Sequence, residues 1–213
     1  MSGIECTGVI LAGGQATRYG GAPKGLERVG GERIIDRVAT ALTGAADRLL
    51  VISNDPAAAE WLAGAAYASD VRPGLGSLGG IHAALARAGT PVLVVAWDMP
   101  FVTAQLLRTI RESGEGADAA VPESSSKRGL EPLCAYYGTS CLEPIERRLD
   151  SGDRRVIAFY DDIDLVRIDR ARIARHGDPE LLFMNVNSPD ELTRAEAHSA
   201  KAAAHGDHCG KEA

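Results

Sequence analysis

The chain has 213 residues and a formal net charge of −6, with 45% hydrophobic and 24% charged residues. This acidic balance argues against nucleic-acid or anionic-membrane partners, because both need a basic surface. No apolar run approaches ~20 residues, so no transmembrane helix is expected. The N-terminus lacks the pattern of a signal peptide, and the four cysteines form no CxxC pair. We therefore expect a cytoplasmic protein, by default a monomer.

Short apolar runs predict buried strands, and apolar residues at helical spacing between them predict helices. The expected strands are 7–11, 49–52, 92–96, 119–121 and 133–137, and the expected helices are 34–42, 57–64, 77–85 and 103–111. Ser77 and Thr103 are the expected caps of the last two helices. This alternation predicts a single Rossmann-like α/β domain, with a mostly parallel central sheet and helices on both faces.

The second half of the chain is less regular. Ser140 and Glu143 predict a capping box for a helix that ends near Leu149, and residues 165–168 predict an edge strand. The run Ser188-Pro189-Asp190-Glu191 has the composition of a helix start. We expect the domain to span residues 1–200 and residues 201–213 to form a disordered tail, because they are small and polar.

A glycine-rich loop follows the first strand directly, over Leu11-Ala12-Gly13-Gly14-Gln15-Ala16-Thr17-Arg18-Tyr19-Gly20-Gly21-Ala22-Pro23-Lys24. Glycines let backbone amides approach an anion, and Arg18 and Lys24 add positive charge suited to phosphates. The loop differs from the phosphate loop of ATPases, because Gly25 follows Lys24, and adjacent Gly13 and Gly14 do not fit the GxGxxG fingerprint. An ordinary strand-to-helix loop with two surface cations is the alternative.

Asp98 follows the most apolar of the predicted strands. A carboxylate at the carboxyl end of a central parallel strand lies where α/β sheets bind ligands. One or two aspartates are enough to hold Mg²⁺ when phosphates and water complete its coordination. The alternative is a cap for the helix near residue 103, a position for which Thr103 is better suited.

The loop at residues 11–24 resembles the signature of the sugar-nucleotide and cofactor nucleotidyltransferases. The segments Gly152-Asp153-Arg154-Arg155-Val156 and Phe183-Met184-Asn185-Val186-Asn187-Ser188-Pro189-Asp190-Glu191-Leu192 resemble those of the molybdenum cofactor guanylyltransferases in particular. The resemblance implies that the N-terminal half binds a nucleotide and the C-terminal half binds the acceptor. It assigns Mg²⁺ to Asp98 and catalytic roles to Arg18, Lys24 and Asp98. The implied nucleotide-binding residues are Leu11, Ala12, Gly13, Gly14, Arg18, Lys24, Asn54, Asp70, Gly79 and Asp98.

Several of these positions also have plain structural explanations. Asp70 begins a segment, residues 70–81, that resembles the family's turn before a helix and would contact guanine, but an aspartate before a loop also forms turns. Asn54 ends the second strand and has the same ambiguity. In the implied acceptor site, Asn185 and Asn187 suit a pterin edge. Asn187 or Ser188 could equally cap the last helix, Asn185 could satisfy a strand end, and Arg154 could be an exposed cation.

By this resemblance, the reaction is transfer of GMP from GTP to molybdenum-loaded molybdopterin, with Mg²⁺ as cofactor and pyrophosphate as by-product. Molybdoenzymes or their chaperones are the implied transient partners, without nucleic acid or membrane. Three alternatives stay open. They are a cytidylyltransferase of the same fold, a nucleotide-binding protein without turnover, and a dinucleotide-dependent oxidoreductase, which the glycine spacing disfavours.

Overall fold

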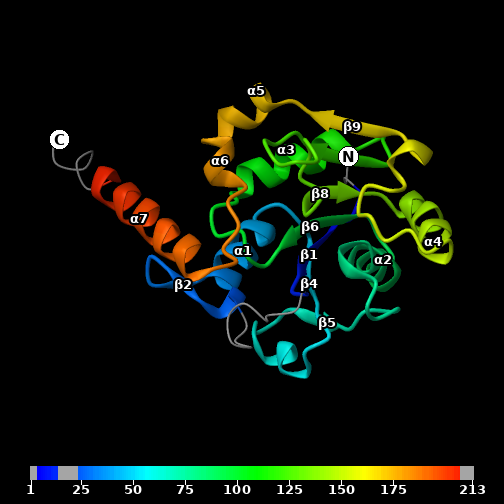
Figure 1. Cartoon of the computed structure of the whole chain (residues 1–213), viewed down its shortest axis with the longest axis horizontal. Helices are drawn as coiled ribbons and strands as arrows, with labels where there is room; N and C mark the ends of the chain where they lie inside the picture. Colours follow the sequence, from blue (N-terminus) through cyan, green and yellow to red (C-terminus); the bar gives the residue numbers. More distant parts are fainter. Residues whose placement is uncertain (1–3, 14–23, 207–213) are drawn as a thin grey trace.

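The computed structural model describes residues 4–13 and 24–206, which form one α/β unit around a seven-stranded sheet (Figure 1). The strands of this sheet are β1 (Thr7–Leu11), β4 (Arg48–Ile52), β5 (Ala66–Ala68), β6 (Val92–Ala96), β7 (Ala119–Pro122), β8 (Cys134–Tyr137) and β9 (Leu165–Ile168). Their spatial order is β5-β4-β1-β6-β8-β7-β9. Strand β8 is antiparallel to both β6 and β7, and the other neighbours pair in parallel. The predicted mostly parallel sheet is confirmed.

Strand β1 lies at the centre of the parallel part, between β4 and β6. Val9 is in register with Leu50 on one side and with Val94 on the other. All five residues of β1, and likewise of β6, are buried. A parallel strand covered on both faces cannot alternate apolar with polar residues, which explains the unbroken apolar runs in the sequence.

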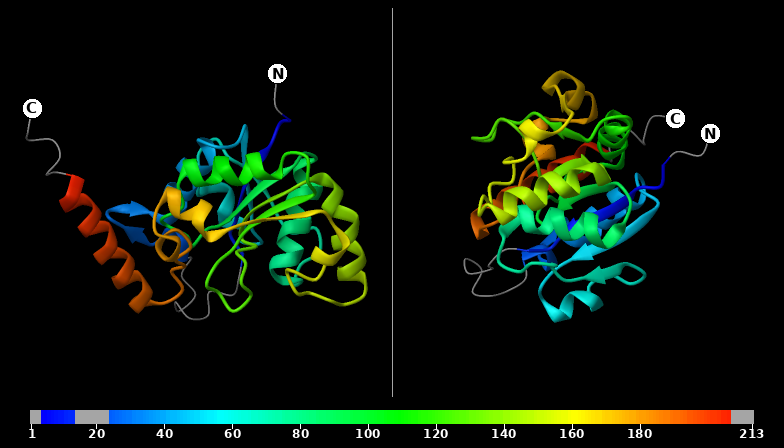
Figure 2. Two further views of the ribbon diagram at one scale, coloured as in Figure 1. Left: turned by 90° about the horizontal axis from the view of Figure 1, so that it is seen from above. Right: turned by 90° about the vertical axis from the view of Figure 1, so that its right-hand side faces the viewer.

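Helices cover both faces of the sheet, as predicted (Figures 1 and 2). The helices are α1 (Ile34–Thr43), α2 (Gly76–Ala88), α3 (Ala104–Gly114), α4 (Leu142–Asp150), α5 (Arg170–Ile173), α6 (Pro179–Leu182) and α7 (Pro189–Gly206). Leu93 and Val95 of β6 pack in the cluster that contains α1 and α3. Val92 and Val94 point to the other face and pack in the cluster with α2 and α4. One strand therefore contributes to two cores.

Local helix signals were only partly correct. Thr103 caps α3 through a bond from Leu106 N (3.2 Å), as expected. Ser77 is not a cap, because α2 begins at Gly76 and its flanking residue Leu75 makes no side-chain bond. The capping box at Ser140 and Glu143 is also wrong. Ser140 donates to Asp118, Glu143 accepts from Arg147 (2.7 Å), and α4 begins at Leu142.

The shorter elements lie between these helices and strands. Residues 57–64 were expected as a short helix, but they overlap only the 3₁₀ turn η3 (Pro56–Glu60). The other 3₁₀ turns are η2 (Lys24–Leu26), η4 (Thr139–Cys141), η5 (Tyr160–Asp162) and η6 (Ala174–His176). Strands β2 (Arg28–Val29) and β3 (Glu32–Arg33) form a separate antiparallel hairpin. Strand β9 lies at the sheet edge, as predicted.

Helix α7 leaves the sheet and contacts the β2–β3 hairpin (Figure 1), where Gly30 N donates to Glu196 Oε2 (3.2 Å). Residues 201–206 continue this helix, so the tail predicted from residue 201 does not begin there. Residues 207–213 lie outside the described part of the chain. Within that part, every helix is too short or too polar to span a bilayer.

The end of α3 makes an unusually close contact with β8, which gives a stability prediction. A Cβ at Gly114 would lie 2.1 Å from Cδ1 of Tyr136, a ring that is buried in the core. Gly114→Ala is therefore expected to lower the free energy of unfolding by about 1–3 kcal/mol, because overpacking forces the ring or the helix to move. Urea denaturation measures the change, and Glu112→Ala on the exposed face of α3 is the control. Equal stability of Gly114→Ala and wild type would contradict this close packing.

Candidate functional site

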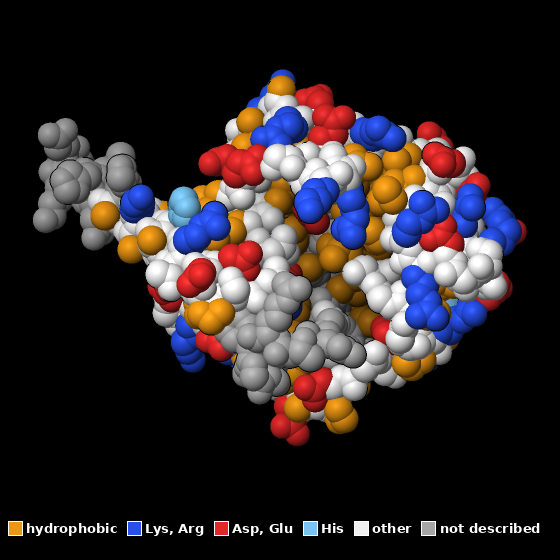
Figure 3. Space-filling view, in the orientation of Figure 1, with side chains coloured by type: hydrophobic (Ala, Val, Ile, Leu, Met, Phe, Trp, Pro, Cys, Tyr) orange, Lys and Arg blue, Asp and Glu red, His pale blue; other side chains and the backbone are white. Residues whose placement is uncertain are grey.

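A cavity of about 760 Å³ lies at the carboxyl ends of β1, β4 and β6. Leu11, Ile52 and Ala96, the last residues of these three strands, all line it. Figure 3 shows the molecule hollowed in this region, with hydrophobic side chains in the hollow. The position agrees with the general rule that open α/β sheets bind ligands at the carboxyl ends of their strands. The volume is in the range of small-molecule sites.

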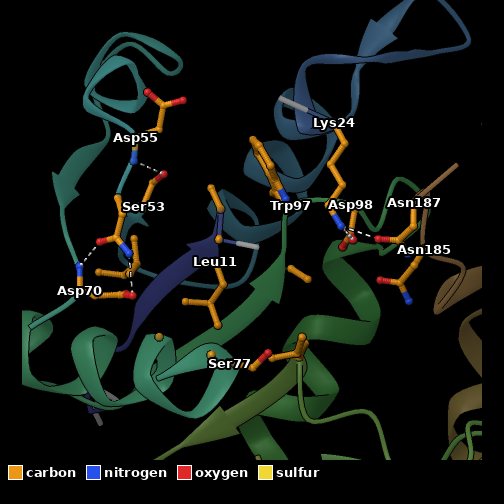
Figure 4. A pocket seen from close by; sticks show the side chains of 18 of the residues that line it. Leu11, Lys24, Ser53, Asp55, Asp70, Ser77, Trp97, Asp98, Asn185 and Asn187 are labelled. Carbon is orange, nitrogen blue, oxygen red and sulfur yellow. Dashed lines mark hydrogen bonds and ion pairs between the residues drawn. The ribbon is translucent and has the colours of Figure 1, made fainter. Parts of the chain in front are cut away.

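Three polar side chains from distant parts of the chain meet in this cavity (Figure 4). Lys24 Nζ donates to Asp98 Oδ2 and to Asn187 Oδ1. The side chains of Lys24 and Asp98 are only 18% and 8% exposed, so the two charges lie mostly out of water and each needs the other. We refer to Lys24, Asp98 and Asn187 below as the polar junction.

Backbone hydrogen bonds hold the segments of the polar junction in place. Val186 N donates to Asp98 O (2.9 Å), which fixes the chain before α7 beside the end of β6. Trp97 N donates to Leu11 O (3.2 Å) and joins the ends of β6 and β1. These are main-chain contacts, so the arrangement depends on the fold more than on the side chains that it presents.

The two explanations offered by the sequence for Asn187 can now be separated. Glu191 N donates to Ser188 Oγ (3.3 Å), and Glu191 Oε2 accepts from Asn187 N (2.7 Å). Ser188 therefore caps α7, as the start signal predicts. The side chain of Asn187 is not used for capping and contacts Lys24 instead. Asn185 also lines the cavity, but its Nδ2 donates locally to Phe183 O (3.1 Å).

Asp98 keeps one carboxylate oxygen free. Oδ1 is buried and has no hydrogen-bond partner among the described residues, whereas Oδ2 accepts from Lys24. A buried carboxylate oxygen without a donor is well suited to a hard cation. The described residues contain no group of three or more His, Cys, Asp or Glu side chains that could hold a metal by themselves. The donor set therefore fits Mg²⁺ only if a ligand supplies further oxygens, as nucleotide phosphates do.

At another part of the cavity wall, Asn54 and Asp70 form a reciprocal pair. Asn54 Nδ2 donates to Asp70 Oδ2 (2.8 Å), and Asp70 N donates to Asn54 Oδ1 (3.0 Å). The pair connects the segments that follow β4 and β5, and both residues line the cavity. Asp70 thus stabilises a loop and also offers a carboxylate to the cavity, so its two interpretations are compatible.

The remaining predicted residues divide into three groups. Leu11, Ala12 and Gly13 line the cavity. Gly79 and Arg154 are not among the lining residues. A Cβ at Gly79 would meet Leu75 Cβ at 2.7 Å, and exposed Arg154 donates to Gly74 O (3.2 Å). Gly14 and Arg18 lie outside the described residues.

Several lining residues were not predicted from the sequence: Ser53, Asp55, Trp61 and Trp97. The two tryptophans stack on each other, with ring centroids 5.2 Å apart and an interplanar angle of 19°. Their apolar surroundings in the sequence resemble core positions, and both are indeed buried. For Trp97, only its place at the carboxyl end of β6 could have indicated a role in the cavity, and Trp61, which follows η3, has no such mark.

Glu131, directly before Pro132-Leu133, is an acidic residue to which the sequence assigned no role. The pKa of its carboxyl is raised from 4.5 to about 7, mainly by burial and also by the negative charge of Asp98, against a backbone bond from Leu133 and the charge of Arg128. The influence of Asp98 places a second acidic group in the electrostatic surroundings of the polar junction. Positive charge in the cavity would favour its ionised form.

Comparisons with known proteins agree with this geometry. A molybdenum cofactor guanylyltransferase from Desulfosudis oleivorans is 39% identical over 195 residues, which cover 90% of this chain and 94% of the relative. A probable molybdenum cofactor guanylyltransferase from Pelotomaculum thermopropionicum is 38% identical over 193 residues, 90% of this chain and 92% of the relative.

Among solved structures, the molybdopterin-guanine dinucleotide biosynthesis protein A from Archaeoglobus fulgidus superimposes with a TM-score of 0.78 and 30% identity. The match covers 92% of this chain and 99% of that protein. The family model of the MobA-like NTP transferase domain matches residues 8–164, which is more than half of the chain and contains Lys24 and Asp98. With the relatives above, this match shows that the chain belongs to the MobA-like NTP transferase family.

Proposed function

We propose that the protein transfers GMP from GTP to the terminal phosphate of molybdenum-loaded molybdopterin. The names of the relatives supply the reaction. The observation in this chain that supports it best is the cavity, which has a lysine and a carboxylate with a free oxygen in the polar junction and the Asn54–Asp70 pair elsewhere in its wall. This distribution suits a ligand with a phosphate end and a hydrogen-bonding base.

The nucleotide would bind with its phosphates at the polar junction. Asp98 is the proposed Mg²⁺ ligand through Oδ1. When bound, Mg²⁺ would neutralise phosphate charge. Lys24 is held by Asp98 and Asn187 and is the described cation at this end of the cavity. The backbone of Gly13 borders the same cavity, and Gly14 and Arg18 would add to the phosphate site.

The base would lie towards Asn54 and Asp70. Guanine presents two adjacent donors on its Watson–Crick edge, and a carboxylate accepts from both. Cytosine presents only one donor group there, so Asp70 supports the choice of GTP. Asn185 and Asn187 remain candidates for the acceptor, with amide groups that both donate and accept. Arg154, which contacts the loop at Gly74, is a third candidate for the acceptor phosphate.

The reaction forms a bond between an acceptor phosphate oxygen and the α-phosphorus of GTP, and it breaks the bond from that phosphorus to the bridging oxygen of pyrophosphate. The acceptor phosphate is already ionised near neutral pH, so no strong general base is needed. Lys24 would balance the charge that develops on the leaving pyrophosphate. Catalysis then depends on positioning and charge neutralisation.

The substrate assignment is tested by pyrophosphate release with Mg²⁺ and molybdenum-loaded molybdopterin, comparing GTP, CTP, ATP and UTP. We expect release with GTP and not with the other three, because the Asp70 carboxylate matches the guanine edge. Release with CTP in place of GTP would move the protein to the cytidylyl branch of the same mechanism. Absence of release with all four would refute the proposed reaction.

Asp98→Asn is expected to lower the rate of GMP transfer by about 100-fold or more, because it removes the charge that would hold Mg²⁺. The fold should persist, since the amide oxygen of asparagine can still accept a hydrogen bond from Lys24 and the bond from Val186 N uses the backbone oxygen of residue 98. Steady-state rates and calorimetric Mg²⁺ titration measure the effect. Asp161→Asn, the same change at an exposed position, is the control. Wild-type turnover by Asp98→Asn would remove Asp98 from the metal site.

The raised pKa of Glu131 predicts a pH dependence of stability without metal. The folded state binds this proton up to about pH 7, and the unfolded chain loses it near pH 4.5. The stabilisation present below pH 4.5 is therefore lost as pH rises to 7, by about 3 kcal/mol. Glu131→Gln should flatten this part of the pH profile in urea denaturation, whereas exposed Glu60→Gln should not. Identical profiles for Glu131→Gln and wild type would contradict the burial of an ionisable carboxyl.

A further inference from the structure

Both tryptophans of the chain lie in the wall of the cavity. Trp97 comes directly between the end of β6 and Asp98, and Trp61 follows η3. Their stacked rings bring these two segments together. The wall next to the polar junction is therefore aromatic, and its position is set by two different parts of the fold.

Trp97 is held firmly. It is 4% exposed, and its backbone N–H bonds to Leu11 O. Gly25 lies against its ring, where a Cβ would come within 2.4 Å of Cε3 and 2.6 Å of Cδ2. Only glycine permits this approach. With Gly25 and Trp61 both packed on it, the indole has little freedom to change its orientation.

The indole nitrogen has no partner. Trp97 Nε1 is buried and makes no hydrogen bond to any described residue. An indole N–H is only a donor, and leaving it unpaired away from water costs free energy. Buried polar groups in native proteins rarely stay unpaired, and exceptions often belong to functional sites. Figure 4 shows the nitrogen at the end of the ring nearer to Lys24 and Asp98.

We propose that Trp97 is a nucleotide-contacting residue whose indole N–H donates a hydrogen bond to an oxygen of the β- or γ-phosphate of the bound nucleoside triphosphate, the part that leaves as pyrophosphate. This inference rests on the proposed function. The phosphate end is favoured over the base because Trp97 adjoins Asp98, whereas Asn54 and Asp70 lie at the ends of other strands. Asp98 Oδ1 and the indole N–H are both without a hydrogen-bond partner among the described residues. The carboxylate oxygen can bind a cation, and the indole N–H can donate to an anion. A metal-bound phosphate satisfies both together.

The test compares Trp97→Phe with Trp61→Phe by calorimetric titration of GTP and of pyrophosphate, both with Mg²⁺ and without acceptor. Each variant keeps an aromatic ring in the stack and loses one indole. We expect Trp97→Phe to weaken both ligands by about 10-fold or more, as for a lost bond to a charged group, and Trp61→Phe to change them by less than about twofold. Thermal unfolding checks that both variants are folded.

Three outcomes would overturn the inference. Wild-type affinity of Trp97→Phe for both ligands would show that the N–H makes no contact. A loss for GTP without a loss for pyrophosphate would assign the donor to another part of the nucleotide. Equal losses in the two variants would assign the effect to packing of the stack. Absence of GTP and pyrophosphate binding in the wild type would instead refute the proposed function itself.

A second variant removes the N–H with almost no change of shape. In the Trp61→Phe background, Trp97 is the one remaining tryptophan of the chain. Biosynthetic replacement by β-(3-benzothienyl)alanine, in which sulfur replaces the indole N–H, therefore alters this position alone. We expect the same loss of about 10-fold for pyrophosphate. Retention of wild-type affinity here would refute the hydrogen bond even if Trp97→Phe were disturbed in its packing.

Discussion

The site depends on keeping one half-buried ammonium paired. Lys24 Nζ contacts Asp98, which lies 74 residues further along the chain, and Asn187, which lies 163 residues further. An unpaired charge at this depth would be strongly destabilising, so the start of η2, the end of β6 and the segment before α7 have to meet. The bond from Val186 N to Asp98 O provides the same connection through the main chain. Charge pairing and backbone geometry thus impose one arrangement, in which Asp98 lines the cavity and its Oδ1 has no hydrogen-bond partner among the described residues.

Strong periodic patterns in the sequence predicted the sheet and most helices, because central parallel strands must be apolar on both faces. Single-residue signals were less dependable. A Ser-x-x-Glu spacing forms a capping box only if the chain enters the helix in the required conformation. Ser140 instead bonds to Asp118, a partner brought in by β7. The antiparallel direction of β8 could not be predicted from its composition, since a buried strand is equally apolar in either direction.

For the site, charged residues after strands were informative, because the carboxyl ends of parallel strands converge. Asp98, Lys24 and Asn187 were all recognised in this way or by resemblance, and the structure brings them together. The tryptophans were missed because a buried aromatic residue has the same sequence appearance in a core and in a cavity wall. Gly79 illustrates a different limit. Neighbouring residues of a helix are rotated by about 100° about its axis, so they face different sides. Of the two adjacent glycines in α2, it is Gly80 that borders the cavity.

The contact between Asn187 and Lys24 also has a consequence for biosynthesis. Strands β1, β4 and β6 are complete by residue 96, so much of the parallel sheet can form while the ribosome is still translating the second half. Asn187, the residue that completes the junction, is made only after β6, α3, β7, β8, α4 and β9 have been translated. A nascent chain would therefore acquire its sheet well before its polar junction. Premature termination between residues 99 and 186 would yield a product with strands β1, β4 and β6 and Asp98 but without the amide partner of Lys24.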